Sequence, residues 1–203
     1  MAILSSEDRA RVEAAIASVE KRSAAEIVVA EIERSDRYLD VRGALAALVA
    51  LGASAALHQL LPLVGTGEVL ALELLLFALV FWLLGSPALL GRCLPVKRVQ
   101  EAVQRAAGLA FLAHGVFATR DRTGVLILLS DLERQVVILG DQGIHAHMPN
   151  DGWDAHVATI VRAIHAGKGG DGVCQVIETL GEKLAELSPA RPDDTNELPD
   201  QVR

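Results

Sequence analysis

The apolar residues of this chain are concentrated in one block near its middle. From Gly43 to Leu90 there is no Lys, Arg or Asp, and the ionisable residues are His58, Glu68 and Glu73. Residues 62–67 supply the Pro and Gly residues that end one helix and begin another. On each side, over about residues 43–64 and 69–90, there are roughly the 20 apolar residues that a helix needs to cross a bilayer. The pattern predicts a transmembrane helical hairpin.

A pair of core helices in a soluble protein is the alternative interpretation of this block. The chain has 203 residues, of which 22% are charged, yet its mean hydropathy is +0.34. About 155 residues lie outside the block, which suffices for one soluble domain. They cannot also surround two helices that are apolar on every side. The membrane interpretation is therefore favoured.

The residues before the block predict one helix and one strand. Serines at positions 5 and 6 can cap a helix, Glu7 and Asp8 suit its first turn, and apolar residues then recur with helical spacing at Val12, Ile16 and Val19. The β-branched run at residues 25–33 indicates a strand that is buried on both faces.

The residues after the block predict a helix, a β-hairpin and two more helices. The first helix presents Val99, Val103, Ala106, Ala110 and Phe111 on one face. The apolar runs 123–130 and 134–141 are separated by a short polar turn, which is typical of a β-hairpin. Each of the last two helices has one apolar face. The first consists of Trp153, Val157, Ile160, Val161 and Ile164, and the second of Val173, Ile177, Leu180, Leu184 and Leu187.

This order of elements indicates a single α/β domain that the hairpin interrupts. Residues 1–42 supply its first part and residues 91–187 its second, because the strand at 25–33 cannot fold without the later strands. Both parts must then meet on one side of the membrane. The segment 188–203 is rich in Pro and acidic residues without an apolar period, which predicts a disordered tail.

Charge predicts the orientation and limits the partners. Basic residues flank the block at Arg34, Arg37, Arg42, Arg92, Lys97, Arg98 and Arg105, whereas the connecting loop has none, so both termini should face the cytoplasm. The start of the chain lacks the features of a cleaved signal peptide. Cys93 and Cys174 match no zinc spacing and are interpreted as packing residues. A net charge of −7 argues against a nucleic-acid partner, and the basic flanks suit lipid headgroups.

Three segments together resemble the TPM domain: "SAAEIVVAEIERSDRY", "RDRTGVLILLSDLERQVVILGDQGIHAHMP" and "WDAHVATIVRAIHAGKGGDGVCQVIETLGEKL". With the hairpin, the chain is similar to uncharacterised membrane-bound TPM-domain proteins of bacteria. The resemblance implies an α/β/α sandwich around a small mixed sheet. Thylakoid relatives are associated with photosystem repair and a proposed acid phosphatase activity, and an animal relative is a receptor-channel accessory protein. The family thus includes enzyme and interaction roles.

One polar edge of the predicted sheet carries the candidate chemistry. In the family pattern, acidic residues occupy positions that read Arg122-Thr123-Gly124 and Gly143-Ile144-His145 here. The β-hairpin still brings these segments together, so the carboxylates and imidazoles of Asp121, Asp141, His145 and His147 can gather there and bind a divalent metal. Arg122 can receive an anion, or it can pair with Asp121 or Asp141 at the surface. The simpler interpretation is a solvated loop with surface ion pairs.

Two function hypotheses follow. The first is a membrane-anchored interaction or assembly module that faces the cytoplasm and binds a membrane-associated protein or further copies of the chain, because no catalytic set or cofactor motif is present. The second is a metal-dependent phosphatase-like hydrolase acting at Asp121, Asp141 and His145. Inside the hairpin, His58 and Glu73 are expected to share a leaflet. They can contact each other and hold the two helices in register, Glu73 can be neutral, or both side chains can extend to the membrane interface. The functional alternative is a proton-sensitive or ligand-sensitive hairpin.

Overall fold

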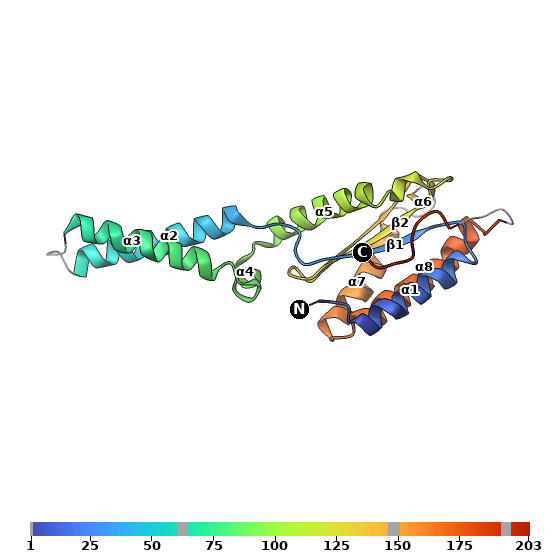
Figure 1. The fold of residues 1–203 in the computed structure, drawn as a ribbon, viewed down its shortest axis with the longest axis horizontal. Helices are drawn as coiled ribbons and strands as arrows, with labels where there is room; N and C mark the ends of the chain where they lie inside the picture. The colour runs from blue at the N-terminus through green and yellow to red at the C-terminus, as the bar shows by residue number, and fades with distance from the viewer. Residues whose placement is uncertain (1, 61–64, 146–150, 192–195) are drawn as a thin grey trace. The chain divides into compact units, whose positions relative to one another are not determined.

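The computed structural model describes residues 2–60, 65–145, 151–191 and 196–203. The chain forms two compact units. The first unit comprises Met1–Asp36 and Val99–Arg203, and the second is Arg37–Arg98. Figure 1 shows the elements of each unit. The first unit contains the sheet and is the α/β domain, and the second unit contains the apolar hairpin.

The α/β domain is built on a three-stranded mixed sheet in the order β1-β2-β3. Strand β1 (Ile27–Ile32) pairs in parallel with β2 (Val125–Ser130), which pairs antiparallel with β3 (Gln135–Gly140). The register places Ile27 opposite Val125 and Ile127 opposite Ile138. The predicted strand, crossover and β-hairpin are therefore confirmed. Every residue of β2 is buried, as its unbroken apolar run indicates for a central strand.

Helices cover both faces of this sheet. On one face, alternate strand residues such as Val29 and Ile127 pack with α1 (Ser6–Glu20), α7 (Asp151–His165) and α8 (Gly169–Leu187). On the other face, residues such as Val28 and Leu126 pack with α5 (Val96–Ala113) and the short turn η1 (Val116–Ala118). Strand residues alternate between the two faces, which is why the apolar runs are continuous.

Helix α1 begins where the sequence predicts. The Ser5 hydroxyl accepts from the Asp8 N–H at 3.0 Å, and the Asp8 carboxylate accepts from the Ser5 N–H at 3.1 Å, which completes a capping box. The three predicted core residues of α1 are fully buried. Helix α1 lies so close to α8 that a Cβ on Gly181 would stand 2.4 Å from a Val19 methyl group, so this contact requires glycine.

The second unit is a hairpin of two apolar helices, α2 (Leu39–Leu60) and α3 (Thr66–Leu83), followed by the short helix α4 (Pro87–Cys93). Both long helices are long and apolar enough to cross a membrane. Both begin earlier than the predicted spans 43–64 and 69–90, and α3 also ends earlier. Helix α3 ends before residue 90 because a turn follows Leu83 and Ser86 caps a new helix with Pro87 at its first position.

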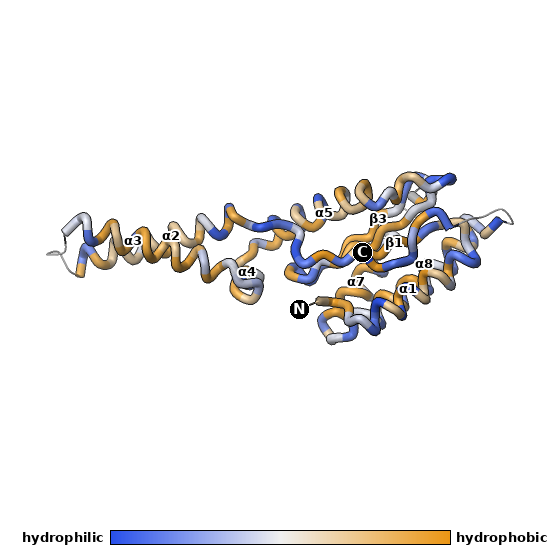
Figure 2. Tube along the Cα trace, viewed as in Figure 1, coloured by the Kyte–Doolittle hydropathy of each residue, from blue (hydrophilic) through white to orange (hydrophobic). Residues whose placement is uncertain are grey.

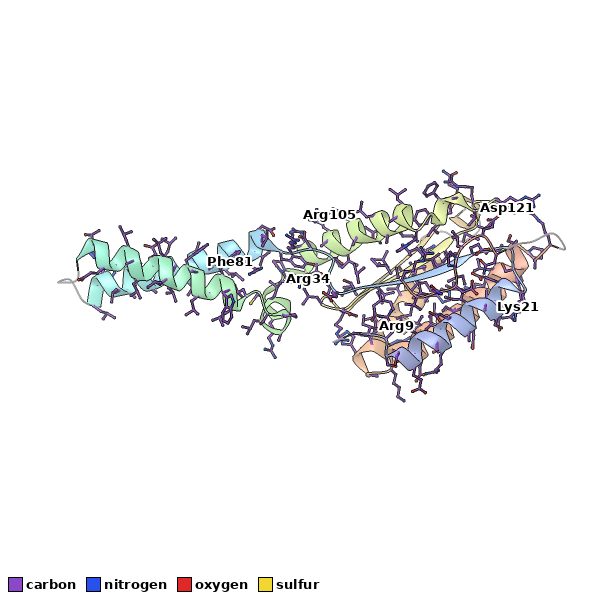
Figure 3. All side chains as sticks on the ribbon, viewed as in Figure 1. Arg9, Lys21, Arg34, Phe81, Arg105 and Asp121 are labelled. Carbon is purple, nitrogen blue, oxygen red and sulfur yellow. The ribbon has the colours of Figure 1, made fainter. Side chains whose placement is uncertain are left out.

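The apolar surface of the hairpin is exposed rather than covered by protein. Within the most apolar 18-residue window, 11% of α2 and 6% of α3 is buried. Figure 2 shows both helices as largely hydrophobic, and Figure 3 shows their side chains projecting outward. A core helix of a soluble domain would instead bury this surface, so the hairpin has the form that a lipid solvent requires.

Residues 188–203 are predicted to be a disordered tail, but the part of this segment that the structure describes contacts the α/β domain. Pro189 forms an isolated bridge with Ser23, and residues 196–203 lie along β1. Arg203 exchanges two backbone hydrogen bonds with this strand, at Val29 and Glu31. Leu198 and Val202 pack against the two core clusters. Composition alone missed this because the free edge of β1 satisfies the backbone polar groups of a segment that has little apolar content.

Candidate functional site

The predicted polar edge brings Arg122 and Asp141 together. The Arg122 Nε lies 2.7 Å from Asp141 Oδ2, and Nη2 donates to Oδ1 at 3.0 Å. The Asp141 side chain is 4% exposed, and its Oδ1 also accepts from the Gln142 N–H at 2.7 Å, where α6 (Gln142–His145) begins. This carboxylate is therefore committed to an arginine and a backbone donor. The interpretation as an ion pair fits this geometry.

Asp121 does not join this pair. Its carboxylate lies 2.8 Å from the Arg191 guanidinium, on a partly exposed surface. The backbone of residues 121–122 does meet the backbone at Gly143. The Gly143 N–H donates to the Arg122 carbonyl at 2.9 Å, and a Cβ on Gly143 would stand 2.6 Å from the Asp121 carbonyl oxygen. The β-hairpin thus produces the expected approach of the backbone, while the two acidic side chains point to different arginines.

The predicted metal site also includes two histidines. His147 and the side chain of His145 lie outside the described residues. Among the described residues, no group of three or more His, Cys, Asp and Glu side chains has the arrangement of a metal site. The metal site and the hydrolase therefore stay predictions. The residues that are described supply a salt-bridged carboxylate rather than a set of open oxygen ligands.

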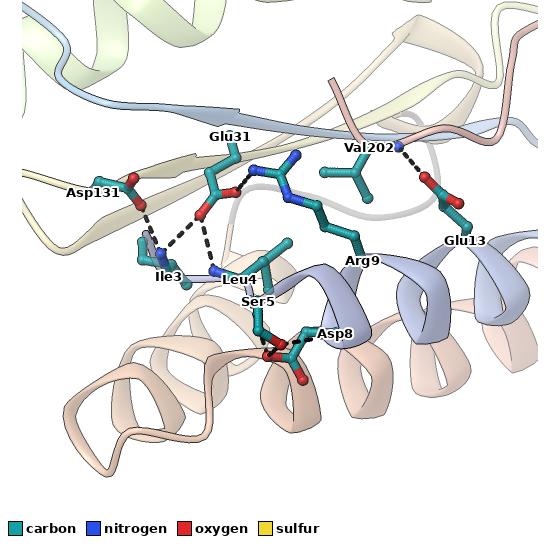
Figure 4. Close-up of polar contacts among 9 residues, drawn as sticks. All are labelled: Ile3, Leu4, Ser5, Asp8, Arg9, Glu13, Glu31, Asp131 and Val202. Atoms are coloured by element: carbon teal, nitrogen blue, oxygen red, sulfur yellow. Dashed lines mark hydrogen bonds and ion pairs between the residues drawn. The ribbon is translucent and has the colours of Figure 1, made fainter. Parts of the chain in front are cut away.

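A second polar cluster, which the sequence analysis missed, lies at the carboxyl ends of the parallel strands. The Glu31 carboxylate accepts from the N–H groups of Ile3 and Leu4 at 2.8 and 2.9 Å and forms an ion pair with Arg9. Asp131 accepts from the same Ile3 N–H at 2.9 Å. Figure 4 shows these contacts. Two adjacent strands thus each provide an acidic residue that holds the segment leading into α1.

Electrostatics couples the two carboxyl groups of this cluster. Burial raises the pKa of Asp131, the Ile3 N–H opposes that rise, and the neighbouring Glu31 carboxylate adds to it. The Glu31 side chain is 3% exposed, and its carboxylate contacts Arg9 and the two backbone donors. The only sequence signal for this cluster is the placement of acidic residues at the ends of two buried apolar strands.

A cavity of about 630 Å³ lies beside this cluster. Its lining includes residues 2–5 together with Asp8, Arg134 and His165. Ligands of open α/β sheets commonly bind at the carboxyl ends of the strands. Here, however, the lining mixes acidic, basic and apolar groups, and the acidic groups at the strand ends already bind the chain's own backbone. This arrangement is suited to positioning the start of the chain.

The contact that the sequence predicts between His58 and Glu73 stays a prediction. No hydrogen bond or ion pair joins these two described side chains, and His58 is exposed. Glu73 lies seven residues after the start of α3 at Thr66, whereas His58 lies two residues before the end of α2 at Leu60. At the helical rise, the difference places the two side chains roughly 7 Å apart along the hairpin axis. The end of α3 at Leu83 places Glu73 near the middle of that helix.

Polar contacts instead join the two ends of the hairpin unit. Arg42, in the first turns of α2, stacks its guanidinium 4.3 Å from the Phe81 ring centroid and donates to the Phe81 carbonyl at 2.7 Å. The Arg98 Nε lies 2.9 Å from Asp40 Oδ2. Arginine can bind an aromatic face and a free helical carbonyl at the same time. These contacts fix the entry and exit of the hairpin, and Trp82, next to Phe81 in α3, is 73% exposed.

Comparisons with known proteins support the fold but no family. No protein-family model matches the chain, and no curated protein matches it either. The chain is similar to a solved structure, the NMR structure of BA42 protein from the psychrophilic bacterium Bizionia argentinensis. The TM-score is 0.60 at 21% sequence identity, over 98% of this chain and 93% of that chain. At this identity the likeness concerns the fold alone.

Proposed function

We propose that this chain is a membrane-anchored interaction or assembly module of the TPM type, with an α/β/α sandwich at the cytoplasmic face of a bacterial inner membrane. The observation that carries the proposal is the position of the hairpin between β1 and β2, which pair in parallel along six residues each. An insertion at this point must leave the domain and return to it on the same side of the bilayer. Two apolar helices with exposed surfaces satisfy that requirement.

The orientation is supported by charge. Basic residues precede α2 and follow α3, and residues 43–90 between them contain no Lys or Arg. Positive residues near a span are retained in the cytoplasm, which favours the domain and both termini on that side. In this orientation we expect Arg42 and Arg98, which stabilise the base of the hairpin, to lie near the lipid headgroups.

The contacts of the buried carboxylates in the described residues support the interaction role. The buried carboxylates of the α/β domain bind the chain's own arginines and backbone, and the hairpin presents lipid-facing apolar surface. An anchored domain of this kind acts by placing a binding surface at the membrane. The partner is accordingly a membrane or membrane-associated protein, or further copies of the chain.

Two measurements test this proposal. Single cysteines are introduced by Thr66→Cys, in the loop end of the hairpin, and Ser18→Cys, in α1, after Cys93 and Cys174 are replaced by Ser. A membrane-impermeant maleimide should label the Thr66→Cys chain in intact cells and the Ser18→Cys chain only after lysis. Labelling in the opposite order, or recovery of the protein in the aqueous fraction, would contradict the topology. Co-purification of the tagged full-length chain from native membranes in mild detergent tests the partner.

A further inference from the structure

Residues 196–203, here called the strap, lie along the outer edge of β1. The Arg203 N–H donates to the Val29 carbonyl at 3.1 Å, and the Arg203 carbonyl accepts from the Glu31 N–H at 2.6 Å. These two bonds bracket Ala30 in the pattern of parallel strands. One residue pair earlier on the same edge, the Ile27 N–H donates to the Glu20 carboxyl at 3.1 Å. The strap and Glu20 thus satisfy the edge that β1 would otherwise expose.

The strap runs in the same direction as β1 and reaches both faces of the sheet. At its start, the N–H groups of Glu197 and Leu198 donate to the Glu26 carboxylate at 3.1 and 3.3 Å. Near its end, the Val202 N–H donates to Glu13 Oε1 at 3.1 Å (Figure 4). Leu198 packs with the core cluster under α5, whereas Val202 packs with the cluster under α1. The strap therefore occupies the position of an added strand.

The charge of the strap does not match the surface beneath it. A cavity of about 310 Å³ is lined by Glu20, Glu26 and Asp200, with Lys21 as the basic residue among its described lining. Asp200 of the strap thus lies beside two carboxyl groups of the domain. Burial raises the pKa of Glu20 to about 8, against the Ile27 hydrogen bond, and the charges of Glu26 and Asp200 add to the rise. The backbone of the strap fits this edge, while Asp200, whose carboxylate accepts from the Asn196 side-chain amide, adds a third acidic group beside Glu20 and Glu26.

We propose that the outer edge of β1 is a docking site for an extended segment of a partner protein that carries a basic residue at the position of Asp200, with the strap as its intramolecular competitor. The added segment would run parallel to β1, take the backbone bonds of Val29 and Glu31, and place apolar residues where Leu198 and Val202 lie. A lysine or arginine beside Glu20 and Glu26 would replace repulsion with attraction. This inference rests on the proposed interaction role and names the partner's chemistry.

The test uses the full-length chain in detergent and two fluorescent peptides. One peptide has the strap sequence NELPDQVR, and the other carries Asp200→Lys. The strap of the protein is loosened by the double substitution Leu198→Asp and Val202→Asp, which removes both apolar anchors. Fluorescence anisotropy should show that the loosened protein binds the basic peptide at least about tenfold more tightly than the acidic one. In a protein that also carries Glu20→Gln, this preference should shrink.

A second variant keeps the test decisive if the loosened protein does not fold. Asp200→Lys in the full-length chain strengthens the strap, so hydrogen exchange at the amides of Glu31 and Arg203 should slow and binding of the basic peptide should fall. Equal binding of the two peptides, or unchanged exchange and binding in this variant, would overturn the proposal. A dimer in which two copies exchange straps would also overturn it, because the occupant would then be a second copy. Cysteine labelling and partner co-purification report on the proposed function separately from all these outcomes.

Discussion

The α/β domain and the hairpin use the same apolar residue types in opposite ways. In the domain, Ile127 and Leu128 of the central strand have no exposed surface. In α3, Leu74 and Leu75 are 70% and 69% exposed, although the helix is the more apolar element. Burial of leucine in the domain stabilises folding in water. Exposure over a whole helix is stable only where the solvent itself is apolar, which is the environment that the proposed membrane insertion would give α3.

The two units also differ in how they treat polar groups. The buried carboxylates Glu31 and Asp141 of the domain each have an arginine and backbone donors. In the described part of the hairpin, the side chains of Arg42 and Arg98 form polar contacts at its base, and Glu68 accepts from the Gly65 N–H at the start of α3. The domain thus buries polar groups that are satisfied within the protein, whereas the hairpin places its polar groups near the ends of its helices.

The largest effect is expected from a charge in the centre of α3. Leu75→Lys places an ammonium group at mid-helix, which opposes insertion by about 3 kcal/mol. Most of the variant should leave the membrane fraction on alkaline carbonate extraction, while the parent protein stays with the membrane. Leu109→Lys is the matched control, because Leu109 of α5 is 68% exposed on the domain. Equal extraction of the Leu75→Lys and Leu109→Lys chains would remove the contrast between the two units.

A smaller effect is expected at the predicted polar edge. Asp141→Ala leaves Arg122 without its buried partner and removes an acceptor at the start of α6, which should lower the free energy of unfolding by about 2 kcal/mol. Urea unfolding in detergent measures the change. Asp121→Ala breaks a more exposed pair with Arg191, so it should cost less than about 1 kcal/mol.

The same Asp141→Ala variant distinguishes a structural from a catalytic carboxylate. We expect no divalent-metal-dependent hydrolysis of a generic phosphomonoester by the parent chain, because the Asp141 oxygens already bind Arg122. Metal-dependent turnover in the parent protein that is lost in Asp141→Ala, with the variant still folded, would instead favour the hydrolase. Equal stability of the Asp141→Ala and Asp121→Ala chains would contradict the structural role.

Local patterns predicted most of the elements, and tertiary contacts explain what they missed. The strands, their order along the chain and the buried faces of α1, α7 and α8 could be predicted from the spacing of apolar residues. This worked because the apolar residues of each element all pack against the same core. The turn at Ser86 that ends the second span early is a local signal, a serine before a proline, which the surrounding apolar residues outweighed. The strap was missed because its composition resembles that of a disordered segment.

The candidate site was less predictable than the fold. The approach of residues 121–122 to Gly143 follows from β-hairpin geometry, but which arginine each aspartate binds does not. Glu31 meets Asp131 across 100 residues of sequence, and Glu20 meets Asp200 across a still longer separation. Such neighbours are set by strand register and by the docking of the strap. No spacing rule within one segment contains that information.

Because of Glu20, the free energy of unfolding should change with pH by about 1 kcal/mol, a figure reduced for the partial exposure of this side chain. Its pKa is about 8 in the folded protein against an ordinary value of 4.5, so the folded state binds more protons between these values. The free energy of unfolding should therefore fall as pH rises from 4.5 through 8, with Glu26 and Asp200 opposing and Lys21 favouring the charged form. Glu20→Gln should match the parent near pH 4.5 and exceed it at pH 9.

Thermal unfolding at pH 5, 7 and 9 measures this difference. Glu7→Gln, at an exposed position in the first turn of α1, is the control and should change the three midpoints equally. If the midpoints of the Glu20→Gln protein and of the parent changed equally with pH, protonation of the acidic cluster under the strap would not affect stability. The domain would then resemble the base of the hairpin, where paired charges are already compensated.

The smallest effect is expected inside the hairpin, at Glu73. Because no hydrogen bond or ion pair joins Glu73 to His58, Glu73→Gln removes no interhelical interaction between them, and helix association in detergent should change by less than about 0.5 kcal/mol. Insertion should also be unaffected, since both side chains are polar and similar in size. His58→Gln is the matched variant on α2, and a double-mutant cycle of the two substitutions measures their coupling. A coupling energy near 1 kcal/mol would mean that the hairpin, like the domain, is held in register by a buried polar pair.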